Sequence, residues 1–178
     1  EQAIAVNGYR SLNFGKELRD QIAAQLSSQF DLSRVPGFYF SDGAWRLCAY
    51  SGLMIPIRNA LGQIQGVQIR RDHADRAKYV WLSSAGKPYG TCARSWVHVA
   101  GDRTQHTAVI TEGPLKGDTA SMLTNNALFL CVPGVSAISY LPQTLRELQL
   151  TTVKEAFDMD KLRNPQVIAA RKRLRKLI

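Results

Sequence analysis

Carboxylates follow two apolar, strand-like runs in the second half of the chain. Residues 107–112 end in Glu112, and residues 153–157 lead directly into Asp158 and Asp160. Because strand side chains alternate between faces, the two aspartates can point the same way, roughly 6.5–7 Å apart. If the two runs are neighbouring parallel strands, about 4.8 Å apart, all three carboxylates share one edge of the sheet. Such oxygen ligands suit Mg²⁺ or Mn²⁺, so the predicted chemistry is phosphoryl transfer on nucleic acid.

Strand-like and helical patterns alternate through this half of the chain. Each of three apolar strands is followed by a helical stretch, an order typical of a parallel sheet with helical crossovers. The expected elements in chain order are residues 107–112, 115–124, 127–132, 141–148, 152–157 and a helix that begins at 165. We expect the strand at 152–157 to be central and buried, although Lys154 and Glu155 place two charges in it.

The first hundred residues have a different pattern, with one helix and several short strands. Apolar residues at every fourth position predict an amphipathic helix over residues 16–30. Asp42-Gly43 predicts a hairpin turn. Residues 52–58 and 63–70 are typical of an antiparallel pair, in which Pro56 favours an edge position.

The change of pattern near residue 101 divides the chain into two predicted domains. We expect residues 1–100 to form an N-terminal helix and a small mixed, mostly antiparallel β subdomain, beginning with the irregular residues 1–14. Residues 101–178 form a parallel sheet with flanking helices, so the predicted fold class is α/β. The chain begins with Glu1 rather than Met, and we therefore expect it to be a piece of a longer protein.

The composition is that of an ordinary globular protein. The chain has 178 residues, of which 45% are apolar and 21% charged, enough for one sizeable core. No run approaches the ~18–20 apolar residues of a membrane span, and no signal-peptide pattern is present. The three cysteines, Cys48, Cys92 and Cys131, are widely spaced, which favours reduced thiols in a cytoplasmic protein without a membrane partner.

The net charge of +9 is concentrated at the C-terminal end. Residues 161–178 hold seven of the 23 Lys and Arg and no acids. The other 160 residues balance 16 basic against 14 acidic side chains, a net charge of only +2. A basic final helix is explained by its dipole and by solvation, and binding of backbone phosphates is a further interpretation.

Several short motifs stand in the order found in the catalytic core of bacterial-type, DnaG-like DNA primases. Glu112-Gly113 and Asp158-Met-Asp160 resemble the carboxylate motifs of the Toprim domain of primases and type II topoisomerases. The upstream motifs are Leu53-Met-Ile-Pro-Ile-Arg58, Gly62-Gln-Ile-Gln-Gly66, Lys78-Tyr79 and Gly86-Lys-Pro-Tyr-Gly90. Each motif alone is common, but the ordered series spans roughly residues 50 to 176. Glu-Gly-Pro-Leu-Lys at 112–116 and Val132-Pro-Gly-Val135 look most like primase-like domains of plasmid, phage and integrative-element replication proteins.

The resemblance implies a Toprim-like parallel sheet and synthesis of primers by nucleotidyl transfer. In that family the glutamate and the aspartate pair bind divalent metal, which implies that Glu112, Asp158 and Asp160 are the catalytic, metal-binding residues, with Mg²⁺ or Mn²⁺ as cofactor. The implied partners are a single-stranded DNA template, nucleoside triphosphates and a helicase domain or protein. The family continues with a fourth core strand and another acidic motif, so we expect this Toprim-like domain to be truncated at its C-terminus.

Basic and aromatic residues are the candidates for binding nucleic acid and nucleotide. Lys78 resembles a family lysine in the basic surface near the active site, and Lys87 resembles a second one. Tyr79 offers a ring that can stack on a base. Arg70 and Arg71 add positive charge for phosphate groups.

Lys116 leaves a second function open, because primases usually carry an acid at this position and the nearest one here is Asp118. Lys116 either neutralises the metal site or holds a phosphate. The alternatives to primer synthesis are a catalytically silent Toprim-like module that binds nucleic acid for a helicase, and a Toprim nuclease. The histidines show no metal-ligand spacing, so we expect His73, His98 and His106 to be structural or solvent-exposed.

Overall fold

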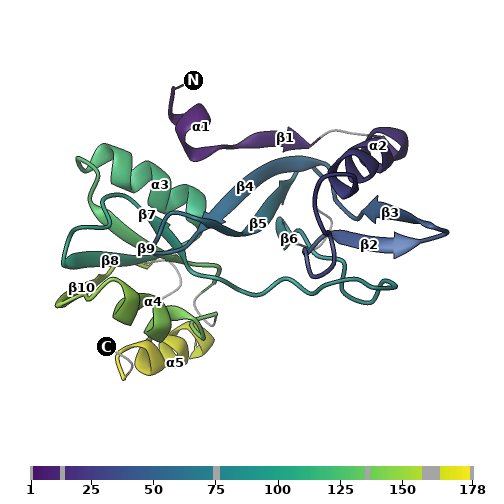
Figure 1. Cartoon of the computed structure of the whole chain (residues 1–178). Helices are drawn as coiled ribbons and strands as arrows, with labels where there is room; N and C mark the ends of the chain where they lie inside the picture. The colour runs from purple at the N-terminus through teal and green to yellow at the C-terminus, as the bar shows by residue number, and fades with distance from the viewer. Residues whose placement is uncertain (1, 13–14, 74–76, 135–136, 158–164, 177–178) are drawn as a thin grey trace. The chain divides into compact units, whose positions relative to one another are not determined.

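The structure is a computed structural model that describes residues 2–12, 15–73, 77–134, 137–157 and 165–176 (Figure 1). Its helices are α1 (Gln2–Asn7), α2 (Lys16–Ser27), α3 (Pro114–Leu123), α4 (Leu141–Glu147) and α5 (Pro165–Leu174). Its strands are β1 (Arg10–Leu12), β2 (Phe38–Ser41), β3 (Ala44–Leu47), β4 (Gly52–Arg58), β5 (Ile64–Arg71), β6 (Tyr79–Trp81), β7 (His98–Ala100), β8 (Thr107–Glu112), β9 (Leu128–Val132) and β10 (Thr152–Glu155). Among the described residues, no helix has the length and apolar character needed to span a membrane.

The chain forms two compact units. Unit 1 consists of residues Glu1–Pro56 and Gly66–Arg94, and unit 2 consists of Ile57–Gln65 and Ser95–Ile178. The tip of the β4–β5 hairpin therefore belongs to unit 2. The division of the chain into functional domains near residue 101 stays a prediction.

Unit 2 is built on a four-stranded sheet with the strand order β10-β8-β9-β7. Strands β10, β8 and β9 run parallel, and β7 runs antiparallel to β9. The chain passes from β8 to the adjacent β9 through α3, and then returns past β8 to β10 through α4. These two crossovers run in opposite directions along the sheet, and because such crossovers are right-handed, their helices lie on opposite faces. Helix α3 covers one face of the sheet, and α4 and α5 cover the other (Figure 1). The predicted parallel α/β sheet is confirmed.

The strands of unit 2 fill an apolar layer on each face of the sheet. All five residues of β9 are buried, as expected of an inner parallel strand. The layer beneath α4 and α5 includes Ile110, Leu128, Leu130, Val132, Leu141 and Leu174. The layer beneath α3 is smaller and includes Ala100, Phe129 and Cys131. The core of unit 2 therefore lies mainly on the α4 side of the sheet.

Helix α3 approaches the sheet closely at Gly117. A Cβ atom at this position would lie 2.0 Å from Sγ of Cys131 on β9. Only a residue without a side chain fits such a contact, so Gly117 sets the distance between α3 and the sheet.

Strand β10 is the outer strand of the sheet in the described part of the chain, which corrects the expected central position of residues 152–157. Lys154 is exposed. Glu155 faces the other side, where Arg171 and Arg175 of α5 donate hydrogen bonds to its two carboxylate oxygens. An outer strand is bordered by solvent, and it therefore accommodates a lysine that a central strand would exclude.

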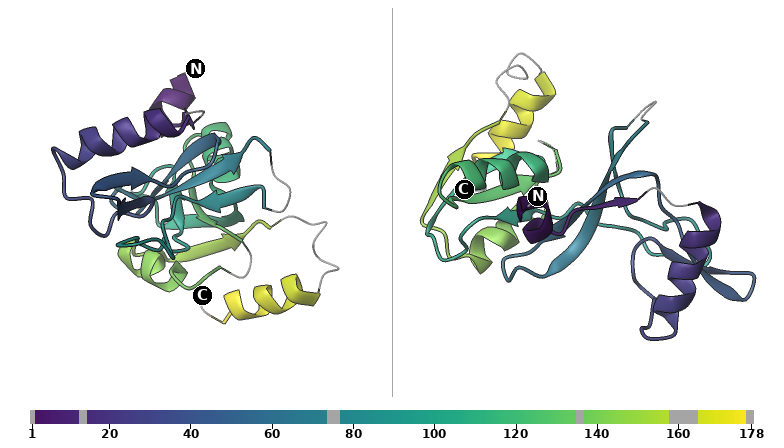
Figure 2. Two further views of the ribbon diagram at one scale, coloured as in Figure 1. Left: turned by 90° about the vertical axis from the view of Figure 1, so that its right-hand side faces the viewer. Right: turned by 90° about the horizontal axis from the view of Figure 1, so that it is seen from above.

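Unit 1 contains the sheet β1-β4-β5-β6 and a separate hairpin of β2 and β3. Asp42 and Gly43 in the hairpin turn have φ values of 52° and 74°, the type I′ geometry that an Asp-Gly pair favours. Helix α2 lies beside this hairpin (Figure 2). Ala23 of this helix forms a small core with Leu32 and Phe38. The predicted helix and hairpin are both present.

The N-terminal residues differ from the expectation of an irregular segment, because they form α1 and β1. Strand β1 pairs antiparallel with β4, and Arg10 lies opposite Met54. The inner position of β4 shows that the edge prediction from Pro56 was wrong. Since β1 begins at Arg10, its pairing stops short of Pro56, and the missing N–H of this proline costs no hydrogen bond to β1.

Candidate active site and nucleic-acid surface

Glu112 is the last residue of β8 and lies at the carboxyl edge of the parallel strands. It is half-buried and pairs in register with Val132 at the end of β9. Gly113 follows with a φ of 85°, which favours glycine, and its N–H donates a hydrogen bond to the Val132 carbonyl at 2.9 Å. Pro114 then begins α3, where the N–H it lacks is not needed. This tight turn holds Glu112 between the end of a strand and the start of a helix.

Strand β10 leads the chain to the same edge. It runs parallel to β8, and the N–H of Ala156 donates to the Ile110 carbonyl at 2.8 Å. Ile110 precedes Glu112 by two residues, and Asp158 follows Ala156 by two. Asp158 and Asp160 lie outside the described residues, so the meeting of the three carboxylates stays a prediction. Across the described segments, no group of three His, Cys, Asp or Glu is arranged to hold a metal ion.

Helix α3 places its two charged side chains in different surroundings. Lys116 is exposed in the first turn after Glu112. Asp118 is buried, and its Oδ1 lies 2.9 Å from Nε2 of His98 on β7. Asp118 is therefore bonded in the interior of unit 2, and Lys116 is the charged residue on the exposed side of the helix.

His98 and Asp118 form a buried polar pair that the sequence analysis did not identify. Only 3% of His98 and 7% of Asp118 is exposed. The backbone N–H of Arg58 donates to His98 Nδ1 at 3.0 Å. A backbone amide can only donate, so Nδ1 carries no hydrogen, and Nε2 donates to Asp118. The sequence feature that could have identified His98 is strand alternation, which places its side chain on the face of β7 opposite Val97 and Val99.

Other ionisable groups surround this pair. Arg103 is half-buried and donates to the Val99 carbonyl at 3.0 Å. Desolvation and the neighbouring Arg58 lower the pKa of Arg103, while the negative charge of Asp118 opposes this shift. Burial, with a smaller contribution from Asp118, raises the pKa of the Cys131 thiol well above its ordinary value. The Arg103 guanidinium is thus close enough to both the Arg58 guanidinium and the Asp118 carboxylate to be influenced by each charge.

Four of the predicted nucleic-acid residues lie together in unit 1. Arg70 and Tyr79 are directly opposite each other on β5 and β6, so their exposed side chains share one face. Arg71 follows on the other face, where its guanidinium carbon lies 5.0 Å from the centre of the Tyr50 ring. The N–H of Arg71 donates to the Lys78 carbonyl at 2.9 Å. Positive and aromatic groups therefore alternate at this end of the sheet.

Lys87, the fifth predicted residue of this surface, lies on the loop beside the β2–β3 hairpin. Its Nζ atom is 5.8 Å from the centre of the Tyr39 ring, within cation–π range. Lys87 is otherwise exposed, and its charge is therefore accessible to an anionic partner.

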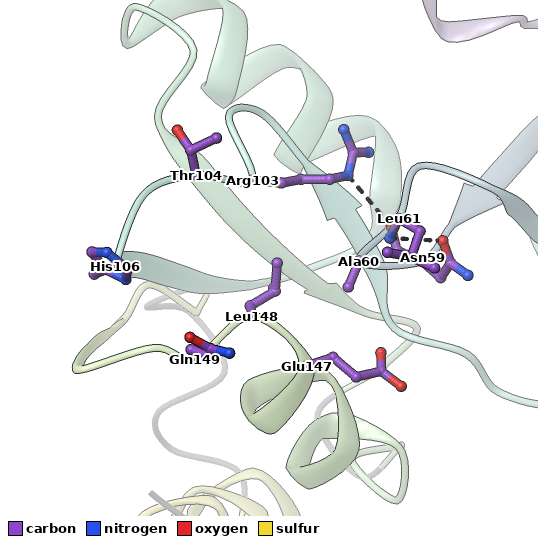
Figure 3. A pocket seen from close by; sticks show the side chains of 9 residues that line it. All are labelled: Asn59, Ala60, Leu61, Arg103, Thr104, His106, Glu147, Leu148 and Gln149. Atoms are coloured by element: carbon purple, nitrogen blue, oxygen red, sulfur yellow. Dashed lines mark hydrogen bonds between the residues drawn. The ribbon is translucent and has the colours of Figure 1, made fainter.

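A pocket of about 450 Å³ lies in unit 2 at the amino ends of β8 and β10, the edge opposite Glu112 (Figure 3). Its lining residues are Asn59, Ala60, Leu61, Arg103, Thr104, His106, Glu147, Leu148 and Gln149. The side chain of Asn59 accepts hydrogen bonds from the N–H groups of Leu61 and Gln63, and Arg103 donates to the Asn59 carbonyl. These contacts shape the hairpin tip, and the pocket contributes nothing to the carboxyl edge.

Solved structures share this architecture. The chain aligns with the Aquifex aeolicus primase (zinc-binding and RNA polymerase domains) at a TM-score of 0.69 and 14% identity, over 99% of this chain and 43% of that one. A DnaG primase catalytic domain bound to ssDNA gives a TM-score of 0.67 and 14% identity, over 97% and 53%. The chain has the fold of the DnaG primase catalytic core.

A third primase aligns over a similar extent. The RNA polymerase domain of Mycobacterium tuberculosis primase DnaG, in complex with double-stranded DNA, gives a TM-score of 0.59 and 17% identity, over 88% of this chain and 51% of that one. The chain thus spans about half the length of the primases it matches. No protein-family model matches the sequence, and a search of curated proteins finds no significant match. The resemblance seen in the sequence motifs is confirmed at the level of the fold.

Proposed function

We propose that the chain is a primase-like nucleotidyl transferase domain that makes primers on single-stranded DNA with a divalent metal ion. The observation that carries the proposal is the parallel pairing of β8 and β10. This pairing directs Glu112 and the segment that leads to Asp158 toward one edge of a primase-type sheet. The motifs at 112–116 and 132–135 favour a replication protein of a mobile element, in which a helicase is the natural partner.

The proposed metal ligands are Glu112, Asp158 and Asp160. Glu112 fits this role because it offers hard oxygen donors at a strand end that is half-buried. Mg²⁺ or Mn²⁺ bound to these carboxylates would supply positive charge against the triphosphate and the attacking oxygen. The turn at Gly113 and Pro114 fixes the backbone of Glu112 relative to α3, which is a step toward a preorganised site.

The proposed reaction joins the 3′-oxygen of the primer to the α-phosphorus of a nucleoside triphosphate. The bond from that phosphorus to the bridging oxygen breaks, pyrophosphate leaves, and the hydroxyl proton passes to solvent. None of the three carboxylates forms a covalent bond. Their contribution is charge and geometry, the usual means of catalysis in phosphoryl transfer.

The template would be bound by positive charge on unit 1. Arg70 and Lys78 offer exposed cations for phosphate groups, and Tyr79 offers a ring beside Arg70. Arg71 is fixed over Tyr50, which keeps its guanidinium at a defined position. One of the structural neighbours is a primase catalytic domain bound to ssDNA, which supports a template of this kind.

Primer synthesis on single-stranded DNA, with labelled nucleoside triphosphates and either Mg²⁺ or Mn²⁺, tests the proposal. We expect extension products with the wild-type, full-length protein that carries this chain, and a loss of at least about 100-fold in Glu112→Gln and Asp158→Ala, because each removes a metal ligand. Glu147→Gln is the matched control, since this carboxylate lies at the opposite edge of the sheet. Full synthesis by a folded Glu112→Gln variant would contradict the assignment. Cleavage of the template instead of extension would identify a nuclease.

A second candidate function is a catalytically silent module that binds single-stranded DNA for a helicase. The observation that favours it is the position of Asp118, which is bonded to His98 in the interior and leaves exposed Lys116 as the charged group of the first turn of α3. Binding of single-stranded DNA without product in either metal would support this function over synthesis.

A further inference from the structure

Tyr89 is an exposed aromatic residue held in an unusual backbone conformation. Its exposed fraction is 80%, and its φ is 53°, a left-handed value that bulky residues rarely adopt. Such a conformation persists only where the surrounding structure imposes it. Tyr89 belongs neither to the proposed metal site nor to the residues predicted to bind nucleic acid.

The loop that carries Tyr89 is tied to strand β2. The buried hydroxyl of Ser84 donates to the Phe38 carbonyl at 2.6 Å, and the N–H of Phe40 donates to the Pro88 carbonyl at 3.2 Å. Gly90 packs so closely that a Cβ atom there would lie 2.0 Å from the Ser84 carbonyl oxygen. These contacts surround Tyr89 on both sides in the sequence, and its backbone is therefore fixed by the fold of unit 1.

The ring of Tyr89 ends a row of three aromatic rings. Tyr89 and Phe40 lie 6.2 Å apart at 85°, and Phe40 and Trp45 lie 5.7 Å apart at 73°, both in edge-to-face arrangements. Trp45 packs against the small core beneath α2. The row therefore connects that core to a tyrosine whose ring is supported by Phe40 but remains largely open to solvent.

The surrounding segment is positively charged. Residues 66–94 contain six Lys and Arg against two Asp. Lys87 lies two residues before Tyr89, so their Cα atoms are at most about 7 Å apart. A rigid exposed ring with a cation nearby is the combination that binds single-stranded nucleic acid, in which bases stack on aromatic side chains and phosphates meet positive charge.

We propose that Tyr89 is a stacking platform for a base of single-stranded DNA, and that Lys87 interacts with the adjacent backbone phosphates. The proposal rests on the proposed function only in taking single-stranded DNA as the ligand, because stacking requires neither metal nor catalysis. Stacking on a single ring tolerates any base, as a template-binding surface requires.

The first test measures binding of a fluorescent oligo-dT by anisotropy. We expect Tyr89→Ala to weaken binding about 5- to 100-fold, the range for loss of one stacked base. Tyr89→Trp keeps a ring and should retain the affinity. Phe30→Ala is the matched control, since Phe30 is also an exposed aromatic residue of unit 1, with 60% exposed, and lies outside the row. Circular dichroism melting checks that each variant is folded.

The second test separates stacking from a structural role. An oligonucleotide of the same length with abasic positions keeps the phosphates but has no bases to stack, so wild type and Tyr89→Ala should bind it equally. Lys87→Gln should reduce the slope of log affinity against log salt by about 0.7, and Tyr89→Ala should leave the slope unchanged. If Tyr89→Ala lowered the binding affinity equally for normal and abasic DNA, or lowered it for neither, the proposal would be overturned. Because binding is measured without triphosphates, the outcome is independent of whether the chain synthesises primers.

Discussion

Nε2 of His98 lies 2.9 Å from Oδ1 of Asp118, and this bond joins β7 to α3 in the interior of unit 2. The N–H of Arg58 fixes the other ring nitrogen, so the imidazole is held from both sides. Helix α3 begins two residues after Glu112, and the pair therefore anchors the helix that borders the proposed metal edge. His98 and Asp118 thus connect α3 to β7 through one buried hydrogen bond.

Removal of the buried acceptor should destabilise unit 2. Asp118→Ala leaves the Nε2–H of His98 without a partner, and we expect the free energy of unfolding to fall by about 1–3 kcal/mol. Asp118→Asn retains an oxygen acceptor, so its free energy of unfolding should fall by less. Urea unfolding followed by tryptophan fluorescence gives these values, with the exposed Thr119→Ala on the same helix as the control. Equal stability of Asp118→Ala and Thr119→Ala would show that the bond does not support the fold.

The contact between α3 and β9 should tolerate no side chain at residue 117. Gly117→Ala places a Cβ atom 2.0 Å from Sγ of Cys131, and overpacking of this kind costs about 1–3 kcal/mol. The Cβ of Cys131 would lie 3.5 Å away, an ordinary contact, so the clash belongs to the sulfur. We therefore expect Gly117→Ala/Cys131→Ala to lose less free energy of unfolding than the two single variants lose in sum. An additive result in a double-mutant cycle measured by urea unfolding would contradict this geometry.

Stability should decrease at alkaline pH because of Cys131. Burial raises the pKa of this thiol in the folded protein, whereas in the unfolded chain it titrates near 9.0. Above that pH the unfolded chain releases a proton that the folded protein keeps, so unfolding becomes more favourable by about 1.4 kcal/mol per pH unit. Below that pH both states are protonated and the effect vanishes.

Cys131→Ala provides the measurement of this effect. The difference in unfolding free energy between wild type and Cys131→Ala should narrow as the pH rises from about 8 to about 10, since only wild type loses stability through this group. Urea unfolding at each pH gives the difference. A constant difference across this range would mean that the thiol ionises equally in both states. Alkylation of the folded protein should modify the exposed Cys92 before Cys131.

The ion pairs of Glu155 should anchor α5 to the sheet. Its carboxylate is largely buried and accepts hydrogen bonds from both Arg171 and Arg175, and Glu155→Gln should therefore lower the free energy of unfolding by about 1–3 kcal/mol. Lys154→Gln is the control, because the adjacent side chain points to the other face and is exposed. Limited proteolysis should release α5 faster from Glu155→Gln than from Lys154→Gln. Equal cleavage rates would show that the apolar face of α5, through Leu174, holds the helix alone.

Local patterns were sufficient to predict most of the secondary structure. The run at 107–112 and the Asp42-Gly43 turn are present where expected, because β-branched alternation and turn chemistry act over a few residues. Strand β1 was missed because its three residues are too few to show a period. Strand β10 is an outer strand among the described residues, and the central position expected from the sequence differs because strand order depends on the direction of each crossover.

The sequence by itself determined that Glu112 ends an apolar strand, that two aspartates follow another, and that the motifs stand in primase order. Only the tertiary structure decided that these two strands are parallel neighbours, that Asp118 is bonded to His98, and that Phe40 supports Tyr89. The physical reason is one of range. Side-chain alternation, caps and turns depend on residues close in the chain, whereas pairing, burial and ring contacts join residues that only the folded core brings together.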